Sequence, residues 1–258
     1  MKNTVIEIEE RRKKLLALIE QNGTAGTKEL SAALNVTEVT IRKDLDELAH
    51  AGKVERIFGG AKANSMPTNS IPESAESALI QQQRSLARAA AQIIKQDEVI
   101  LLNSSRTVSY LMEYTNDIPI TIISNNASAF LRNISPNTLL ILTGGQILRG
   151  RNSMTGPYTI ETIKRNNVSK CILGVRGISI RGGITSAVLE EATINKTMIE
   201  QTSGPVIVVA ASNKIGRDDS FRICGLEEID YFVTDNGISE SDRSAFEKNG
   251  VHVIIATP

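Results

Sequence analysis

Seven short apolar runs between residues 97 and 258 constrain the fold of this chain more than any other feature. Each run holds three to six residues, and stretches with helical spacing alternate with most of the runs. Strands that alternate with helices form a parallel sheet, because each helix carries the chain back across the sheet. We therefore predict an α/β domain with parallel strands at residues 99–102, 120–123, 139–142, 171–175, 206–210, 231–233 and 251–256.

The stretch before the first run and most of the stretches between runs supply the predicted helices. In such a sheet, ligands bind beyond the carboxyl ends of the strands, so the residues that follow each run are the first candidates for chemistry. The predicted helices span residues 77–95, 108–114, 127–133, 158–166, 189–201 and 239–249.

Small, polar and glycine-rich segments follow the runs. Hydroxyl groups and free backbone amides at helix N-termini favour an anion, and Arg106 and Lys214 can supply countercharge. Any one of these segments is more often a tight turn than a binding site, but six of them together predict a pocket for a phosphate-bearing metabolite. The predicted effector-binding residues are Asn103, Ser104, Ser105, Arg106, Thr107, Ser124, Asn125, Gly144, Gly145, Arg176, Thr185 and Lys214.

Near the N-terminus, residues 37–48 predict a short amphipathic helix with Thr37 as its N-cap. Apolar residues recur at i, i+4 and i+7 and form one stripe, namely Ile41, Leu45 and Leu48. The opposite side carries polar and charged residues, namely Glu38, Thr40, Arg42 and Lys43. Such side chains can contact phosphates or base edges in DNA. Taken alone, this stretch fits an ordinary solvated helix face equally well.

The neighbouring segments favour DNA binding. Residues 9–21 and 27–34 predict two further helices, the second capped by Thr27. Residues 53–58 alternate polar and apolar side chains before two glycines, which predicts a strand and a turn. Three short helices and a basic hairpin make a winged helix-turn-helix, with the motif at about 24–43. The predicted DNA contacts are Thr27, Thr37, Glu38, Thr40, Arg42, Lys43, Arg56 and Lys62.

Composition limits the remaining possibilities. The formal net charge is zero, so DNA affinity must come from local placement of Lys and Arg. Cys171 in an apolar run and Cys224 in a loop-like stretch have neither metal-ligand spacing nor a disulfide framework. No run reaches the roughly 18 apolar residues of a membrane span, and no signal-peptide core is present. We expect a soluble cytoplasmic protein with a DNA-binding domain at 1–62, a linker at 63–76 and an effector domain at 77–258.

These segments resemble a known family. The resemblance rests on Glu10-Arg11-Arg12, Thr27-Lys28-Glu29-Leu30, Val36-Thr37-Glu38-Val39-Thr40-Ile41-Arg42-Lys43-Asp44-Leu45 and Arg56-Ile57-Phe58-Gly59-Gly60-Ala61, which are similar to the N-terminal domain of DeoR-family bacterial repressors of sugar metabolism. It implies that residues 36–45 are the recognition helix. It continues through nearly all of the large domain and implies a fold like that of ribose-5-phosphate isomerase, with a phosphorylated sugar as inducer. It also adds Arg149 to the predicted effector-binding residues.

Three strand-end segments depart from the family pattern. Where the family usually has Asp-Ser-Gly-Thr-Thr, this chain has Asn103-Ser104-Ser105-Arg106-Thr107. Where it usually has Ala-Asp-Gly-Ile, this chain has Val175-Arg176-Gly177-Ile178. The usual Asp-Ser-Ser-Lys is replaced by Ala211-Ser212-Asn213-Lys214. Three carboxylates are absent and two arginines are present, so we predict an unusually cationic pocket. This leaves two possibilities. In the first, the effector is more anionic, such as a bisphosphate or an acidic sugar phosphate. In the second, the arginine side chains partly occupy the ligand space.

A ligand-controlled repressor is the function that these features favour over two alternatives. An isomerase-like enzyme with a DNA-binding appendage needs a carboxylate base, and only Asp235, Glu190 and Glu191 remain as candidates. An architectural DNA protein would not need so large a ligand-binding domain. We therefore expect no catalytic residues, no metal and no cofactor. The expected partners are operator DNA, an anionic effector and further copies of the chain, as a dimer or tetramer.

Overall fold

The computed structural model describes residues 5–50, 53–57, 59–63, 73–115, 118–148 and 150–257. The chain divides into two compact units, Met1–Ser74 and Ala75–Pro258, and each is described by itself. Within the described residues, no helix combines the length and apolarity needed to cross a membrane.

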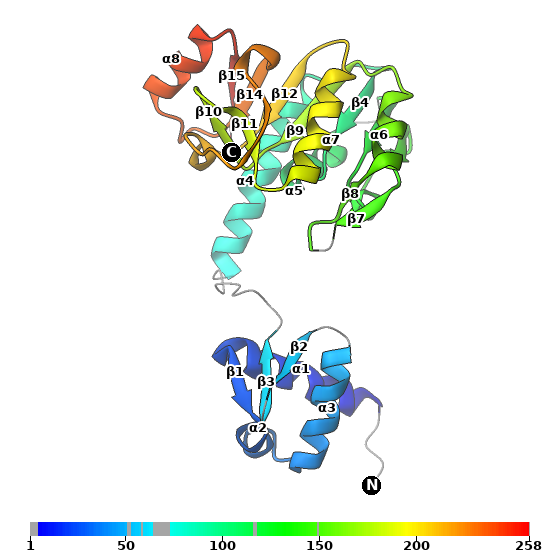
Figure 1. Ribbon diagram of the computed structural model, residues 1–258, viewed down its shortest axis with the longest axis vertical. Helices are drawn as coiled ribbons and strands as arrows, with labels where there is room; N and C mark the ends of the chain where they lie inside the picture. Colours follow the sequence, from blue (N-terminus) through cyan, green and yellow to red (C-terminus); the bar gives the residue numbers. More distant parts are fainter. Residues whose placement is uncertain are drawn as a thin grey trace. The chain divides into compact units, whose positions relative to one another are not determined.

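Unit 1 is a helix-turn-helix domain with a three-stranded wing sheet (Figure 1). Its elements are α1 (Val5–Asn22), β1 (Thr24–Gly26), α2 (Thr27–Leu34), α3 (Glu38–His50), β2 (Val54–Ile57) and β3 (Gly60–Ala63). The sheet order is β1-β3-β2, and both pairings are antiparallel. The three helices and the hairpin confirm the predicted winged helix-turn-helix. Strand β1 was not predicted, because three small residues carry no strand pattern and become a strand only by pairing with β3.

The core of unit 1 draws one apolar stripe from each helix. The fully buried side chains include Leu15, Ile19, Leu30, Ile41 and Leu45. The same interior holds one carboxylate, which lies on the inner side of α3 and pairs with two arginines of α1. The pairs join Asp44 Oδ2 to Arg11 Nε at 2.6 Å and Asp44 Oδ1 to Arg12 Nε at 3.0 Å.

Helix capping follows the prediction at α3 and differs at α2. Thr37 Oγ1 accepts a hydrogen bond from the backbone N–H of Thr40 at 3.3 Å, as expected of an N-cap. The predicted cap at Thr27 is wrong, because Gly26 is the N-cap of α2 and makes no side-chain cap bond. Asn35 ends this helix in the left-handed conformation, with φ 51°.

Unit 2 is built on a seven-stranded parallel sheet, and its seven strands coincide with the seven apolar runs. They are β4 (Val99–Leu102), β5 (Ile120–Ser124), β6 (Thr138–Leu142), β9 (Lys170–Gly174), β12 (Val206–Val209), β14 (Tyr231–Thr234) and β15 (His252–Ile255). The order across the sheet is β15-β14-β12-β9-β4-β5-β6. From β4 the chain continues to one side through β5 and β6, and then crosses to β9 on the other side. The topological switch point, where such sheets bind ligands, therefore lies between β4 and β9.

Helices cover both faces of this sheet. They are α4 (Glu73–Ala91), α5 (Arg106–Ser109), α6 (Pro157–Lys164), α7 (Leu189–Glu200), α8 (Glu240–Lys248) and the 3₁₀ helices η1 (Tyr110–Tyr114), η2 (Ala129–Leu131), η3 (Ser212–Lys214) and η4 (Leu226–Glu228). Successive residues of one strand enter opposite cores, as strand geometry requires. Leu101 packs with residues of α6, α7 and α8, whereas Ile100 and Leu102 pack with α4 and α5.

Several short elements differ from the sequence-based expectation. Helix α4 begins at Glu73, inside the predicted linker, where residues 73–76 contain neither glycine nor proline to stop a helix. The predicted helix at 127–133 is wrong, since only η2 forms there. Its start is diverted into a turn, in which the Asn126 side chain accepts from the N–H of Ser128 at 2.9 Å. Further short strands were not predicted, namely β7 (Gln146–Leu148), β8 (Ser153–Thr155), β10 (Gly177–Ser179), β11 (Gly183–Ser186) and β13 (Phe221–Cys224).

Candidate functional site

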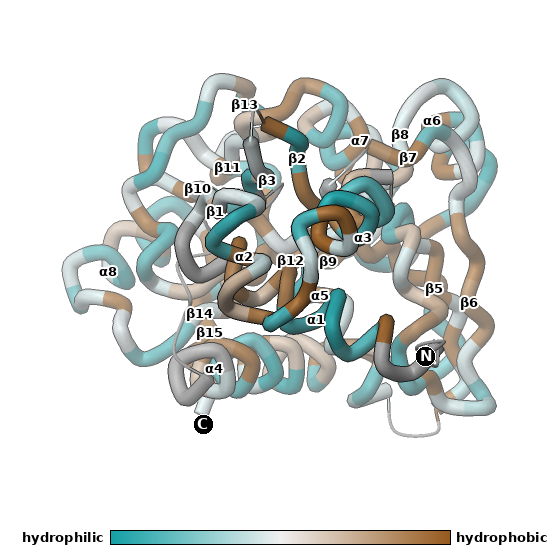
Figure 2. The backbone as a smooth tube through the Cα atoms, turned by 90° about the horizontal axis from the view of Figure 1, so that it is seen from below, coloured by the Kyte–Doolittle hydropathy of each residue, from teal (hydrophilic) through white to brown (hydrophobic). Residues whose placement is uncertain are grey.

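The exposed side of α3 presents several of the residues that the sequence predicts to contact DNA. Figure 2 shows α3 with both hydrophilic and hydrophobic segments along its turns. Ile41 and Leu45 are buried, while Thr37, Arg42 and Lys43 are exposed. Arg42 forms an i,i+4 ion pair that joins its Nη2 to Glu38 Oε2 at 3.4 Å, and Thr40 is half-buried. The face therefore offers two cations and a carboxylate on a single helix, which suits a DNA groove.

The wing is attached to the helices by specific hydrogen bonds. Arg56 Nη1 donates to the carbonyl of Gly60 at 3.1 Å, and its Nε pairs with Asp46 Oδ1 at 3.1 Å. Thr27 is buried, and its Oγ1 donates to the carbonyl of Gly59 at 2.9 Å. Thr27 was predicted to contact DNA, but in the structure its hydroxyl joins α2 to the wing. Lys62 is exposed on β3.

A hollow in unit 1 lies where the start of α2, the start of α3 and the wing meet. Its lining is cationic and consists of Gly26, Thr27, Lys28, Glu38, Arg42, Arg56 and Gly59. Lys28 was not among the predicted DNA contacts. Its place at the start of α2 gave it no distinguishing pattern in the sequence, because a lysine in a first helical turn is also an ordinary solvated residue.

In unit 2, a cavity of about 230 Å³ lies at the carboxyl ends of β4 and β9, at the switch point of the sheet. Its lining is mostly polar and comes from strand ends, from β8 and from α7. The lining residues are Asn103, Ser104, Ser105, Arg106, Asn125, Arg151, Ser153, Gly174, Val175, Arg176, Thr185, Ser186, Glu191, Asn195 and Ile223.

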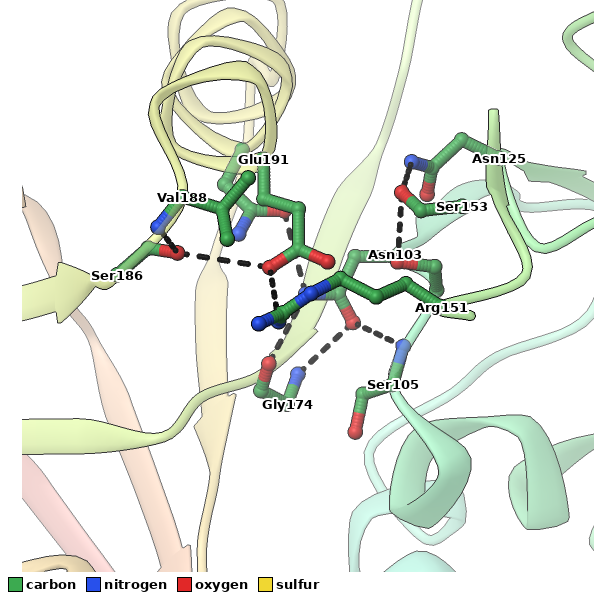
Figure 3. Close-up of polar contacts among 11 residues, drawn as sticks. Asn103, Ser105, Asn125, Arg151, Ser153, Gly174, Ser186, Val188 and Glu191 are labelled. Carbon is green, nitrogen blue, oxygen red and sulfur yellow. Dashed lines mark hydrogen bonds and ion pairs between the residues drawn. The ribbon is translucent and has the colours of Figure 1, made fainter. Parts of the chain in front are cut away.

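Asn103 joins the ends of β4 and β9 beneath the cavity (Figure 3). Its Nδ2 donates to the carbonyl of Gly174 at 3.0 Å and to Asn195 Oδ1 at 3.2 Å. Its Oδ1 accepts from the N–H groups of Gly174 at 3.0 Å and Ser105 at 3.3 Å. A Cβ at Gly174 would lie 2.0 Å from Ser105 Oγ, so only glycine permits this approach. Asn103 was predicted to bind the effector, but its amide already bonds to the protein.

Asn125 presents an acceptor without a partner in the described part of the chain. This side chain is 1% exposed, and its Nδ2 donates to Ser153 Oγ at 3.2 Å and to the carbonyl of Met154 at 3.0 Å. Its Oδ1 is buried and accepts no hydrogen bond among the described residues. Because a buried unpaired acceptor is costly, Oδ1 is suited to accept from a ligand hydroxyl or amine.

Arginines dominate the charge of the cavity lining. Arg106 and Arg176 are exposed, and neither forms an ion pair within the described residues. Arg151 Nη1 pairs with Glu191 Oε2 at 3.3 Å (Figure 3). Three arginines and one glutamate give the lining two net positive charges, which favours an anionic ligand.

The positive charge of Arg176 affects the pKa of Lys214, although Lys214 does not line the cavity. Burial lowers the pKa of Lys214, and the positive charges of Arg217 and Arg176 lower it further. Lys214 therefore extends the cationic region beyond the cavity wall. An anion bound between these groups would reverse part of the shift in its pKa.

Some predicted effector residues do not reach the cavity. Ser124 is fully buried, and its Oγ accepts from the N–H of Asn126 at 3.1 Å. Gly144 and Gly145 support α6 instead, since Thr159 Oγ1 donates to the carbonyl of Gly144 at 2.7 Å and a Cβ at Gly145 would lie 2.3 Å from that hydroxyl. Thr107 and Lys214 are absent from the lining. Arg149 lies outside the described residues.

Five residues line the cavity but were not among the predicted effector-binding residues, namely Arg151, Ser153, Ser186, Glu191 and Asn195. Arg151 and Ser153 belong to the hairpin of β7 and β8, whose short strands gave no pattern. Glu191 and Asn195 are four residues apart on α7, which is the spacing of one helix face. That spacing was a usable signal, but nothing in the sequence pointed this face toward the ends of β4 and β9.

Comparisons with known proteins identify a family domain in each unit. Residues 79–236 match the family model described as DeoR C terminal sensor domain, and residues 11–66 match the model described as DeoR-like helix-turn-helix domain. The chain is 32% identical over 253 residues to a putative aga operon transcriptional repressor of Escherichia coli O157:H7, covering 95% of this chain and 93% of that protein.

Two further similarities concern a sugar-system repressor and a solved structure. A lactose phosphotransferase system repressor of Staphylococcus epidermidis is 28% identical over 232 residues, with 88% of this chain and 92% of that protein covered. Ribose 5-phosphate isomerase A from Methanocaldococcus jannaschii aligns with 12% identity and a TM-score of 0.39, covering 53% of this chain and 54% of that chain. The sensor-domain match alone spans more than half of the sequence. With a helix-turn-helix domain in one unit and a sensor-domain match across the other, the chain belongs to the DeoR family of helix-turn-helix transcriptional regulators.

Proposed function

We propose that this regulator is a cytoplasmic repressor of a carbohydrate uptake or catabolism operon. Its DNA-binding domain, residues 1–62, holds operator DNA through α3 and the wing. A phosphorylated sugar or a related anionic metabolite binds the effector domain, residues 77–258, and releases the operator. The relative that is named a lactose phosphotransferase system repressor supports the link to carbohydrate metabolism.

The arginines of the cavity carry the proposal of an anionic effector. Arg106 and Arg176 lack a carboxylate partner in the described chain, while Glu191 is already paired with Arg151. An anion that enters such a cavity gains charge-assisted hydrogen bonds without displacing a protein carboxylate from these two arginines. We therefore favour a ligand with more than one negative charge, such as a bisphosphate or an acidic sugar phosphate, over a pocket that the arginines fill themselves.

The uncharged part of the cavity supports a hydroxyl-bearing ligand. Asn125 Oδ1 is an unpaired acceptor, and Ser153 and Ser186 add hydroxyl groups to the lining. A ligand with hydroxyls at one end and negative charge at the other would satisfy both regions. That combination is the chemistry of a phosphorylated or oxidised sugar.

Release of the operator follows from thermodynamic coupling in an oligomer. Operator and effector favour different arrangements of the DNA-binding domains, so each ligand lowers the affinity for the other by the same factor. A single winged domain offers few contacts, so useful specificity requires at least a dimer on a two-fold operator. We propose a dimer or a tetramer, which sedimentation of the full chain with and without DNA would distinguish.

Calorimetric titration tests the effector proposal. We expect a hexose bisphosphate or a sugar-acid phosphate to bind more tightly than the corresponding neutral hexose, and Arg176→Ala to weaken the anionic ligands about 10-fold or more. Arg181→Ala is the matched control, because Arg181 lies nearby in the sequence but is 93% exposed and outside the lining. Tight binding of the neutral hexose that Arg176→Ala leaves unchanged would refute the anionic effector.

An isomerase-like enzyme is the alternative that the cavity disfavours. Enediol chemistry needs a carboxylate base, and Glu191 is the carboxylate among the described lining residues, where it is held by Arg151. Asp235 is a poor base: desolvation raises its pKa, but hydrogen bonds from the Ser212 side chain and backbone outweigh that effect and lower it. Turnover of a pentose or hexose phosphate by the purified chain, followed by NMR, would establish the enzyme instead.

A further inference from the structure

One large apolar side chain of α3 lies outside the core of unit 1. Val39 is 75% exposed, whereas Ile41, Leu45 and Leu48 of the same helix are buried. Val39 is also absent from the hydrophobic cluster that those residues form, both as a buried and as a partly buried member. Core packing therefore does not account for a valine at this position.

Val39 shares its side of α3 with the cationic residues of the reading face. Residues at i, i+3 and i+4 are neighbours on a helix, so Val39 lies one turn before Arg42 and Lys43. The ion pair between Glu38 and Arg42 spans the same turn and lies beside the valine. Val39 is the second residue of α3, and the first residues of a recognition helix are those that reach base edges.

The chemistry of valine selects one group in the major groove. Valine offers two methyl groups and no hydrogen-bonding atom beyond the backbone, while most base edges present donors and acceptors. The apolar group on a base edge is the C5-methyl of thymine. A β-branched side chain has one strongly preferred rotamer in a helix, so the two methyl groups are already fixed before DNA arrives.

We propose that Val39 reads the C5-methyl group of a thymine in each operator half-site. This inference rests on the proposed placement of α3 in the major groove. Arg42 and Lys43 then supply charge-assisted contacts one turn further along, and Val39 adds discrimination without charge. The result is a preference for thymine that is independent of salt concentration.

Deoxyuridine tests the contact, because it differs from thymidine by the methyl group alone. Duplexes are selected from a random library by the full-length wild-type chain, and each thymine of the selected site is replaced singly by deoxyuridine. We expect one position per half-site at which the replacement weakens wild-type binding about 4-fold, the effect of one buried methyl-sized group. Val39→Ala should bind the thymine duplex about 4-fold more weakly and should not distinguish the two bases at that position.

Leu189→Ala is the matched control, because Leu189 is an exposed apolar residue at the start of a helix in the other unit. It should retain the full wild-type response to deoxyuridine. A selected site without thymine, or a deoxyuridine penalty that persists unchanged in Val39→Ala, would overturn the role of Val39. If Arg42→Ala still weakens binding in that case, the DNA-reading face stands and only the methyl contact fails. If Arg42→Ala is also without effect, the placement of α3 itself fails.

Discussion

The two proposed sites of this chain differ in the burial of their uncharged polar side chains. On α3 and the wing, Arg42, Lys43 and Lys62 are exposed, and the ion pair of Arg42 with Glu38 lies at the surface. In the sensor cavity, Asn103 and Asn125 are buried, and nearly all of their polar atoms bond to the protein. A DNA surface must match a partner that carries its own dense charge, whereas a small-molecule cavity must be shaped before the ligand arrives.

This difference decides how each site responds to substitution. Removing an exposed cation changes DNA affinity and leaves the fold intact, because water replaces the lost partner at little cost. Removing a buried polar group leaves its hydrogen-bond partners unsatisfied and lowers the stability of the fold as well. The substitutions below test this contrast.

The largest effect is expected at Asp44, which is the buried exception within the DNA-binding unit. Asp44→Ala leaves Arg11 without its carboxylate and Arg12 with only its 3.7 Å pair to Glu47, and should lower the free energy of unfolding of this unit by about 3 kcal/mol. Scanning calorimetry measures the change. Asp46→Ala is the control, because its pair with Arg56 is exposed, and it should cost under about 0.5 kcal/mol. Equal losses of unfolding free energy in the two variants would show that burial does not distinguish these ion pairs.

Arg42→Ala should weaken binding to the selected operator about 10-fold, because Arg42 supplies a charge-assisted contact from the reading face. Fluorescence anisotropy at fixed salt measures the dissociation constant, and the melting temperature should stay unchanged. Arg243→Ala removes a comparable i,i+4 pair, with Glu247 on α8, and should leave DNA binding as it is. Loss of folding in Arg42→Ala would show that this residue is structural.

Lys62→Ala should produce a smaller and less selective loss. We expect weaker binding to all duplex sequences and a slope of log affinity against log salt that is shallower by about 1, since one phosphate contact disappears. Titrations at several salt concentrations give the slope. Lys164→Ala, an exposed lysine of the sensor unit, serves as the control. An unchanged slope would place Lys62 away from the DNA backbone.

The smallest effect is a proton taken up when an anion binds near Lys214. The pKa of Lys214 is lowered in the folded chain, which means that its protonated form destabilises the fold. This destabilisation is fully present below the folded-state pKa and is lost as pH rises from there toward the ordinary lysine pKa. A bound anion raises the pKa again. In this alkaline window, calorimetry in buffers of different ionisation enthalpy should therefore detect proton uptake that Lys214→Met abolishes. Identical enthalpies in all buffers for the wild-type chain would contradict this arrangement.

The sequence by itself determined the elements that repeat a strong local pattern. The seven apolar runs became the seven parallel strands, because a strand buried on both faces must be apolar along its length. Thr37 with Ile41 and Leu45 defined α3, because capping and helical periodicity are properties of neighbouring residues. For the same reason the exposed side of α3 could be predicted before any tertiary contact was known.

Tertiary structure decided which polar residues form the sensor cavity. Arg151 meets Glu191 across 40 residues of sequence, and Asn103 meets Gly174 across 71. Neither pairing has a local signature, because both depend on how the strands are ordered around the switch point. Gly144 and Gly145 illustrate the converse. Their sequence favoured a ligand-binding loop, but in the structure they pack against Thr159 of α6. Local patterns therefore specified the elements, and only their assembly specified the site between them.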